Sequence, residues 1–292
     1  MDLKNIFSLK KYRREPLPKG IFEGTVDVHT HLLPGVDDGF QKEEDTLEAL
    51  RVWAEAGVKG VICTPHFMES YPANRRPTIE ERFASFQQNF VTPPPLSTPP
   101  PLGEVGRGLP FPPPLSTPPP LGEAGRGLPG RGLPRRGLPS LYLAGEYMVD
   151  DAFASHASDG YLDIGGSGWV LTETSYADIH PQHTQLLYDM SLEGYEPVIA
   201  HPERYQYASD RRYESWKRKG FKFQLNLLSL SGAYGEAAKE KAEWMLREGM
   251  YNYVGSDVHN LRNFLSWMPK ILLAPAQTDE LRHLLENNLR LL

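Results

Sequence analysis

The chain has 292 residues and a formal net charge of −6, so it is long enough for one α/β domain and predicts no general affinity for nucleic acid. Its single cysteine, Cys63, excludes an internal disulfide and indicates a reducing compartment, for which we expect the cytoplasm. The sequence contains neither the roughly 20 apolar residues of a membrane span nor the apolar core of a secretory signal.

Residues 1–21 are predicted to form a basic tail. The tail carries Lys4, Lys10, Lys11, Arg13, Arg14 and Lys19, with Ile6 and Phe7 between them. We expect it to be solvated, and the alternative is weak, peripheral contact with an anionic membrane face. Residues 22–292 are predicted to form one domain.

Short apolar runs alternate with amphipathic stretches across that domain. The predicted strands cover 25–29, 60–64, 141–146, 169–173, 197–201, 223–226 and 251–256. The predicted helices cover 43–56, 78–90, 182–193, 209–219, 235–248 and 278–292. Strand–helix alternation repeated about seven times predicts a parallel α/β architecture.

Residues 91–140 interrupt this alternation. The segment PPPLSTPPPLGEVGRGLPF is followed directly by PPPLSTPPPLGEAGRGLPG, a tandem repeat with too few apolar residues to bury a face. It predicts a disordered insert with polyproline II character. Either the insert binds a proline-recognising partner domain, or it is a surface-loop expansion, which is tolerated because loop entropy grows slowly with length.

Histidines and acidic residues gather where the predicted strands end. They are His29, His31, His66, Glu146, Glu173, His201, Asp257 and His259, with Asp37 and Asp38 shortly after the first pair. Catalytic groups at the ends of several strands are typical of a parallel barrel, whereas an open doubly wound sheet concentrates them at one switch point. A closed or nearly closed barrel is therefore expected.

Mixed imidazole and carboxylate ligands predict a hydrolytic metal centre. The set is larger than one ion needs, so two or three ions are implied, and adjacent ions can activate a bridging hydroxide for phosphoryl transfer. Glu146 and Glu173 suit a bridging role. Arg204, three residues after His201, can hold a phosphate oxygen or form a salt bridge with Glu203 or another acid.

Six motifs along the chain resemble those of a known superfamily. DVHTHLLPGVDDG, TPHF, AGEYM, LTETSY, IAHPERY and GSDVHN are similar, in order, to the motifs of the PHP (polymerase and histidinol phosphatase) superfamily. More narrowly, they resemble its bacterial manganese-dependent tyrosine phosphatases, which are associated with capsular and exopolysaccharide synthesis. The resemblance covers residues 22–292 apart from the insert. It implies a distorted (β/α)7 TIM-like barrel with a trinuclear metal site at the C-terminal ends of the strands.

The resemblance also implies ligands for each ion. The first ion would be held by His29, His31, Glu146 and Asp257, the second by Glu146, Glu173 and His201, and the third by Asp38, His66 and His259. Asp37 is an alternative to Asp38, and Asp27 is expected to orient a histidine. Three Mn²⁺ ions are expected, with Fe, Co or Zn as alternatives.

The function implied by the resemblance is hydrolysis of phosphotyrosine on a protein, namely the tyrosine-rich tail of a membrane-associated autokinase. Metal-bound hydroxide would attack phosphorus, and the predicted catalytic residues are Arg204, Asp257 and His259. The alternatives are a histidinol-phosphate-type small-molecule phosphatase and a non-catalytic metal-binding scaffold. Whether the chain forms a homo-oligomer is open.

Other reactive residues fit this chemistry poorly. Cys63 does not fit a cysteine-based phosphatase, because the segment CTPHFMES lacks the arginine of a phosphate-cradling loop. The remaining histidines match no motif and are expected to be surface or structural residues; they are His156, His180, His183 and His283.

Overall fold

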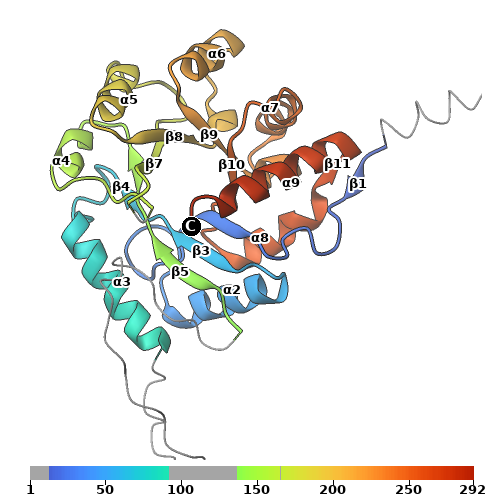
Figure 1. The fold of residues 1–292 in the computed structure, drawn as a ribbon, viewed down its shortest axis with the longest axis horizontal. Helices are drawn as coiled ribbons and strands as arrows, with labels where there is room; N and C mark the ends of the chain where they lie inside the picture. The colour runs from blue at the N-terminus through green and yellow to red at the C-terminus, as the bar shows by residue number, and fades with distance from the viewer. Residues whose placement is uncertain (1–12, 92–136, 165) are drawn as a thin grey trace, which may run out of the picture.

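A computed structural model describes residues 13–91, 137–164 and 166–292 (Figure 1). Residues 1–12 of the predicted tail and residues 92–136 of the predicted insert lie outside the described residues. The parallel α/β architecture is confirmed, because every pair of neighbouring strands in the two larger sheets is parallel.

The parallel strands form a three-stranded and a six-stranded sheet. The first has the order β2 (Val26–Thr30), β3 (Gly60–Cys63), β5 (Ser140–Leu143). The second has the order β10 (Tyr253–Gly255), β9 (Lys222–Asn226), β8 (Glu196–Ala200), β7 (Trp169–Glu173), β6 (Glu146–Met148), β4 (His66–Phe67). Strands β2, β3 and β7 are buried along their whole length. The apolar composition of β3 predicts this, whereas β2 and β7 also bury polar residues, among them the predicted ligands His29 and Glu173.

The two sheets meet where β3 leads into β4 and β5 leads into β6. Pro65 lies in the first junction and has no N–H to donate to a ladder, and in the second junction Gly145 donates to the Leu162 carbonyl. The amides of Ala144 and Glu146 still donate to the carbonyls of Cys63 and Pro65, at 2.9 and 3.1 Å. The expected single strand over 141–146 is therefore split in two.

The expected closed (β/α)7 barrel is not confirmed, and the described residues form no closed barrel. Between β2 and β10 the ladder is reduced to one isolated bridge, Thr30–Val258, with a hydrogen bond from Asp257 N to His29 O at 2.8 Å. Asp257 has a φ of 51°, so the chain leaves the extended conformation soon after β10 ends. This turn prevents a regular ladder at that edge.

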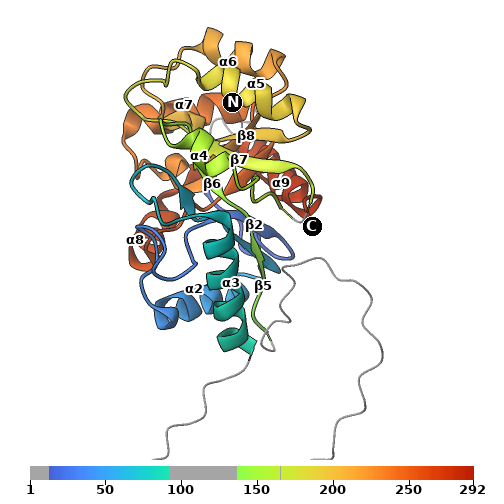
Figure 2. The same cartoon turned by 90° about the vertical axis from the view of Figure 1, so that its left-hand side faces the viewer.

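Helices surround the sheets. They are α2 (Glu43–Glu55), α3 (Arg76–Val91), α4 (Phe153–Ala157), α5 (His183–Leu192), α6 (Asp210–Arg218), α7 (Glu236–Arg247), α8 (Leu261–Trp267) and α9 (Pro275–Leu289). In both views α5 and α6 lie beside the six-stranded sheet, whereas α2 and α3 lie beside the three-stranded sheet (Figure 1, Figure 2). Short 3₁₀ turns occur at η1 (Pro202–Arg204), η2 (Leu227–Ser231) and η3 (Met268–Lys270).

The described end of the predicted tail is attached to the domain. Strand β1 (Glu15–Pro16) pairs antiparallel with β11 (Leu272–Leu273), and the Arg14 guanidinium forms an ion pair with Glu243 on α7. Within the described residues, every helix is too short or too polar to cross a membrane.

Candidate metal centre

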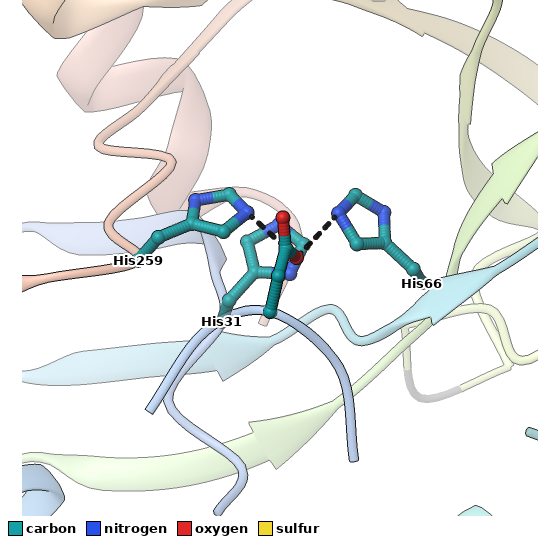
Figure 3. A group of neighbouring side chains, drawn as sticks. His31, His66 and His259 are labelled. Atoms are coloured by element: carbon teal, nitrogen blue, oxygen red, sulfur yellow. Dashed lines mark ion pairs between the residues drawn. The ribbon is translucent and has the colours of Figure 1, made fainter. Parts of the chain in front are cut away.

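The predicted ligands meet in three overlapping groups, but they do not all lie at the carboxyl ends of strands. Glu173 ends β7, and His201 and Asp257 follow β8 and β10, whereas His66 and Glu146 are the first residues of β4 and β6. The groups are His29, His31, Glu146 and Asp257; His66, Glu146 and Glu173; and His31, Asp38, His66 and His259. Within each group, one ligand atom from every residue lies within 4.8 Å of the others. Figure 3 shows the rings of His31, His66 and His259 directed toward a common point.

Glu146 lies at the centre of the cluster and is fully buried. Its Oε2 lies 3.2 Å from His29 Nε2, 3.3 Å from His31 Nε2 and 3.1 Å from His66 Nδ1. Its Oε1 lies 3.2 Å from His201 Nε2, which brings the remaining predicted ligand to the site. One carboxylate thus lies within 3.3 Å of four imidazoles, a central position that suits the bridging role expected of it.

Asp257 and His201 have left-handed backbone conformations, with φ of 51° and 35°. Among the described non-glycine residues they alone have positive φ, a conformation that costs free energy and persists where the surroundings enforce it. The turn points Asp257 Oδ1 at His29 Nε2 and His31 Nε2, at 3.2 and 3.3 Å. Strained backbone at two predicted ligands is typical of a functional site.

The two neighbouring aspartates have different surroundings. Asp37 Oδ2 lies 2.9 Å from His31 Nδ1 and accepts the backbone amide of His66 at 3.1 Å. This carboxylate therefore holds the His31 ring through the nitrogen that does not face Glu146, and it also holds the backbone of His66. The half-exposed Asp38 places Oδ1 3.3 Å from His66 Nε2 and 3.4 Å from His259 Nε2. Asp38 therefore lies with the imidazoles on the cavity side, which is where a ligand would be.

The group that orients His29 differs from the expected one. Asp27 does not contact a histidine ring among the described residues. Its carboxylate accepts from Trp53 Nε1 at 2.8 Å, from Ser256 N at 3.0 Å and from the backbone amide of His29 at 3.4 Å. The ring is oriented by Gln224 instead, whose Oε1 lies 2.9 Å from His29 Nδ1. Asp27 thus holds the backbone of His29, and Gln224 holds its ring.

Several buried atoms of the cluster have no hydrogen-bond partner among the described residues. They are His66 Nδ1, Glu146 Oε2, Glu173 Oε1, His201 Nδ1 and Asp257 Oδ1. Unpaired buried polar atoms cost free energy, and each calls for an explanation. Imidazole nitrogens and carboxylate oxygens in this arrangement fit divalent first-row metal ions, which would satisfy the atoms that converge on the centre.

The electrostatics of the cluster keep its acids ionised. Burial acts to raise the pKa of Glu146, but His29 and the other imidazoles outweigh it and hold that pKa well below its usual range. Burial likewise opposes ionisation of Asp257, whose pKa His29 and His259 lower. The same ion pairs raise the pKa of His29, His31 and His66, so a metal ion that binds here would displace protons from these imidazoles.

A cavity of about 350 Å³ opens over the cluster. Its walls include Asp38, His66, His201, Asp257 and His259, together with Arg204. Arg204 Nη1 lies 3.0 Å from Asp257 Oδ2, so the acid that it pairs with is Asp257 and not Glu203. Glu203 is instead buried, and it accepts from Ser229 Oγ and Tyr251 Oη at 2.7 and 2.9 Å. A second cavity of about 170 Å³ is mostly apolar, and none of the predicted ligands lines it.

The histidines without a motif lie outside the three ligand groups. His156 and His183 are buried, His180 lies 3.4 Å from Asp151, and His283 is on the exposed side of α9. The prediction that these are surface or structural residues agrees with these positions.

We expect the buried His183 to make the stability of the fold depend on pH. Burial, with the nearby Arg212 charge, lowers the pKa of His183 from 6.5 to about 4. Between pH 6.5 and 4 the His183 imidazole is protonated in the unfolded chain but neutral in the folded chain. The free energy of unfolding therefore decreases as pH falls through this range. Between pH 6.5 and 4, the free energy of unfolding of His183→Leu should decrease by up to about 3 kcal/mol less than that of the wild type, at about 1.4 kcal/mol per pKa unit. Urea unfolding at both pH values measures this, and equal losses in the two proteins would contradict it.

Sequence reasoning missed the residues that support the ligands. Gln224 orients His29, Asn226 Nδ2 donates to Asp257 Oδ2 at 2.7 Å, and Gly255 leaves room for His29. Gly255 could have been noticed, since it lies two residues before Asp257 in a ligand motif. Gln224 and Asn226 of β9 lie in none of the ligand motifs, so the sequence does not mark them.

Comparisons with known proteins show which proteins the chain resembles. The family model described as "Capsular polysaccharide synthesis, CpsB/CapC" matches residues 25–93 and 139–274. The chain is 25% identical over 271 residues to the tyrosine-protein phosphatase YwqE of Bacillus subtilis (strain 168), covering 91% of each chain. It is 24% identical over 247 residues to the tyrosine-protein phosphatase CpsB of Streptococcus pneumoniae, covering 81% of this chain and 83% of the relative.

A solved structure has a similar fold. It is described among the crystal structures of "YwqE from Bacillus subtilis and CpsB from Streptococcus pneumoniae, unique metal-dependent tyrosine phosphatases". It matches with a TM-score of 0.62 at 21% identity, covering 90% of this chain and 94% of that chain.

Proposed function

Because the chain belongs to the capsular polysaccharide synthesis CpsB/CapC family, we propose that it is a metal-dependent phosphatase that hydrolyses phosphotyrosine on a protein. The observation that carries the proposal is the buried cluster around Glu146, whose unpaired ligand atoms lie beneath a cavity lined by Arg204. The names of the relatives support the tyrosine substrate.

The proposed ligand sets are those that the resemblance implies. His29, His31, Glu146 and Asp257 would hold one ion, Glu146, Glu173 and His201 a second, and Asp38, His66 and His259 a third. The second set differs from the corresponding group of the cluster, because it takes His201, 3.2 Å from Glu146 and 3.6 Å from Glu173, in place of His66. His31 and His66 each also fall in a neighbouring group, so they lie close to two of the proposed ions. Bound Mn²⁺ ions would supply a water activated near neutral pH and charge neutralisation at the phosphate.

The chain's own residues would bind and orient the phosphate. Arg204 presents a planar fork of N–H donors to the cavity, which suits two phosphate oxygens. His259 has a side chain that is 30% exposed, and its Nδ1 lies 3.0 Å from the Asp257 carbonyl, which fixes the ring. We propose that His259 acts at this exposed edge, where a proton can reach the leaving phenolate, and that the buried Asp257 holds Arg204 and the His259 ring in place.

The wider context is proposed from the resemblance. The substrate would be the tyrosine-rich tail of a membrane-associated autokinase of capsule or exopolysaccharide synthesis, and the protein would act in the cytoplasm. We also propose that the strands form a distorted barrel that is interrupted between β2 and β10. A histidinol-phosphate-type phosphatase and a metal-binding scaffold are the competing functions.

One experiment separates these functions. The protein is stripped with a chelator, Mn²⁺ is returned, and phosphate release is measured from a phosphotyrosine peptide and from histidinol phosphate, with His201→Ala as the control. Metal-dependent release from the peptide that is absent in the control supports the proposal. Release from histidinol phosphate alone would move the protein to the small-molecule class, and no release from either would leave the scaffold.

Replacing Cys63 distinguishes a cysteine-based mechanism, which needs the thiol, from the proposed metal-dependent mechanism, which does not. Cys63 is fully buried, and burial raises the pKa of its thiol to about 12, so almost no thiolate forms at neutral pH. We expect Cys63→Ala to keep phosphate release within about twofold of the wild type, since the thiol packs in the core. Loss of turnover in a variant that keeps its melting temperature would contradict the metal mechanism.

A further inference from the structure

Arg204 lies between two tyrosine rings at the wall of the cavity. Its guanidinium carbon is 4.3 Å from the centre of the Tyr176 ring and 4.1 Å from the centre of the Tyr234 ring. The three residues come from separate segments: Tyr176 follows β7, Arg204 ends η1, and Tyr234 follows η2. A guanidinium between two aromatic faces gains cation–π attraction on both sides.

Hydrogen bonds hold the Tyr234 side chain and the backbone of Tyr176. The Tyr234 hydroxyl accepts from Asn226 Nδ2 at 3.2 Å, and the same amide donates to Asp257 Oδ2 at 2.7 Å. The Tyr176 carbonyl accepts from the Gln206 amide at 3.0 Å, which ties its loop to the turn after η1. The Tyr234 ring is therefore held through its hydroxyl, and Tyr176 is held through its backbone.

Most N–H groups of the Arg204 guanidinium donate to no acceptor among the described residues. Nη1 donates to Asp257 Oδ2 at 3.0 Å, and among the described residues Asp257 is the one hydrogen-bond acceptor of this guanidinium. An arginine has five N–H donors in a fixed plane. Both rings pack against the guanidinium carbon, and the N–H groups that do not donate to Asp257 are left for a ligand. Arg204, Tyr176 and Tyr234 all line the cavity above the cluster.

We propose that Tyr176 and Tyr234 are positioning residues, which clamp Arg204 in the orientation that binds the phosphate group of the substrate. The proposal rests on the proposed function, because it takes a phosphomonoester as the ligand. A long arginine side chain normally loses rotamer freedom when it binds an anion, and the clamp removes that freedom in advance. The expected ligand is a phosphate dianion whose oxygens meet the guanidinium edge.

Matched variants test the clamp. Tyr176→Phe and Tyr234→Phe keep the rings, whereas Tyr176→Leu and Tyr234→Leu remove them. The first readout is the affinity of the Mn²⁺-loaded protein for inorganic phosphate, measured by titration calorimetry. The second readout is KM for a phosphotyrosine peptide, and metal content is measured in every variant. We expect each leucine variant to weaken phosphate binding and raise KM by about tenfold, and each phenylalanine variant by less than about threefold.

A double-mutant cycle shows whether the rings act through the arginine. In an Arg204→Ala background the leucine substitutions should change phosphate affinity by less than about twofold, because the clamped group is gone. Equal effects in both backgrounds, or leucine variants that lose metal or melting temperature while keeping phosphate affinity, would overturn the proposal. If the wild type binds phosphate but releases none from the peptide, the proposed function fails, and the clamp is still judged by the phosphate affinities.

Discussion

Replacing Glu146 by glutamine is expected to lower phosphate release from a phosphotyrosine peptide by about 10³-fold or more and to reduce the bound metal. The glutamine keeps the shape of the side chain but removes the charge that faces His29, His31 and His66 through Oε2. It also places an amide, which ligates metals poorly, where two or more ions would share a carboxylate. The measurement is phosphate release at saturating Mn²⁺, with metal content by atomic emission.

A charge-matched control separates this loss from a general effect. Glu286 is an exposed residue of α9, far along the chain from every predicted ligand. Glu286→Gln should leave both activity and metal content unchanged, because exposed substitutions away from special sites have small effects. A Glu146→Gln protein with wild-type turnover would remove Glu146 from the catalytic centre.

Replacing Gly255 by alanine is expected to destabilise the fold by about 3 kcal/mol, which lowers the melting temperature by roughly 6–12 °C, and to abolish most activity. An added Cβ would lie 2.5 Å from His29 Cβ and 2.9 Å from Gln224 Nε2. Both neighbours are fully buried, and one of them orients the other's ring, so neither can move without displacing a proposed ligand. Thermal unfolding and phosphate release measure the two effects.

Gly194 provides the matched control. It has a φ of +93°, and an added Cβ would meet nothing within 4 Å, so Gly194→Ala tests backbone strain without a steric clash. We expect a cost of about 1 kcal/mol and full activity. Equal activity in Gly255→Ala and Gly194→Ala would show that the close approach of β10 to His29 is unimportant.

Periodicity predicted the longer elements but not the closure of the sheet. The strand over 169–173 and the helix over 43–56 agree with β7 and α2 within one residue, because each has a continuous buried run or one apolar face. Helices α4 and α8 have 5 and 7 residues, too few for a periodic pattern to appear. The barrel expectation rested on where the ligands lie, and that placement is satisfied by two sheets that meet at an irregular seam.

The ligand positions were predictable because acids and imidazoles stand at the ends of strands in parallel alignment. Which atoms face one another was not, since it depends on side-chain directions that spacing does not determine. Asp27 and Gln224 illustrate this: the nearer residue in sequence holds the backbone of His29, and the residue 195 positions away holds its ring. The clamp on Arg204 likewise joins three loops with no local sequence signal.

The bridge between Thr30 and Val258 has a consequence for biosynthesis. It joins the first strand of the domain to a residue made more than two hundred positions later, and His29 depends on both Gln224 and Asp257. A ribosome adds about 5–20 residues per second, so Gln224 and Asp257 are synthesised many seconds after His29. The cluster can assemble only after nearly the whole chain has emerged, and any metal would then be acquired by an essentially complete fold rather than by the nascent chain.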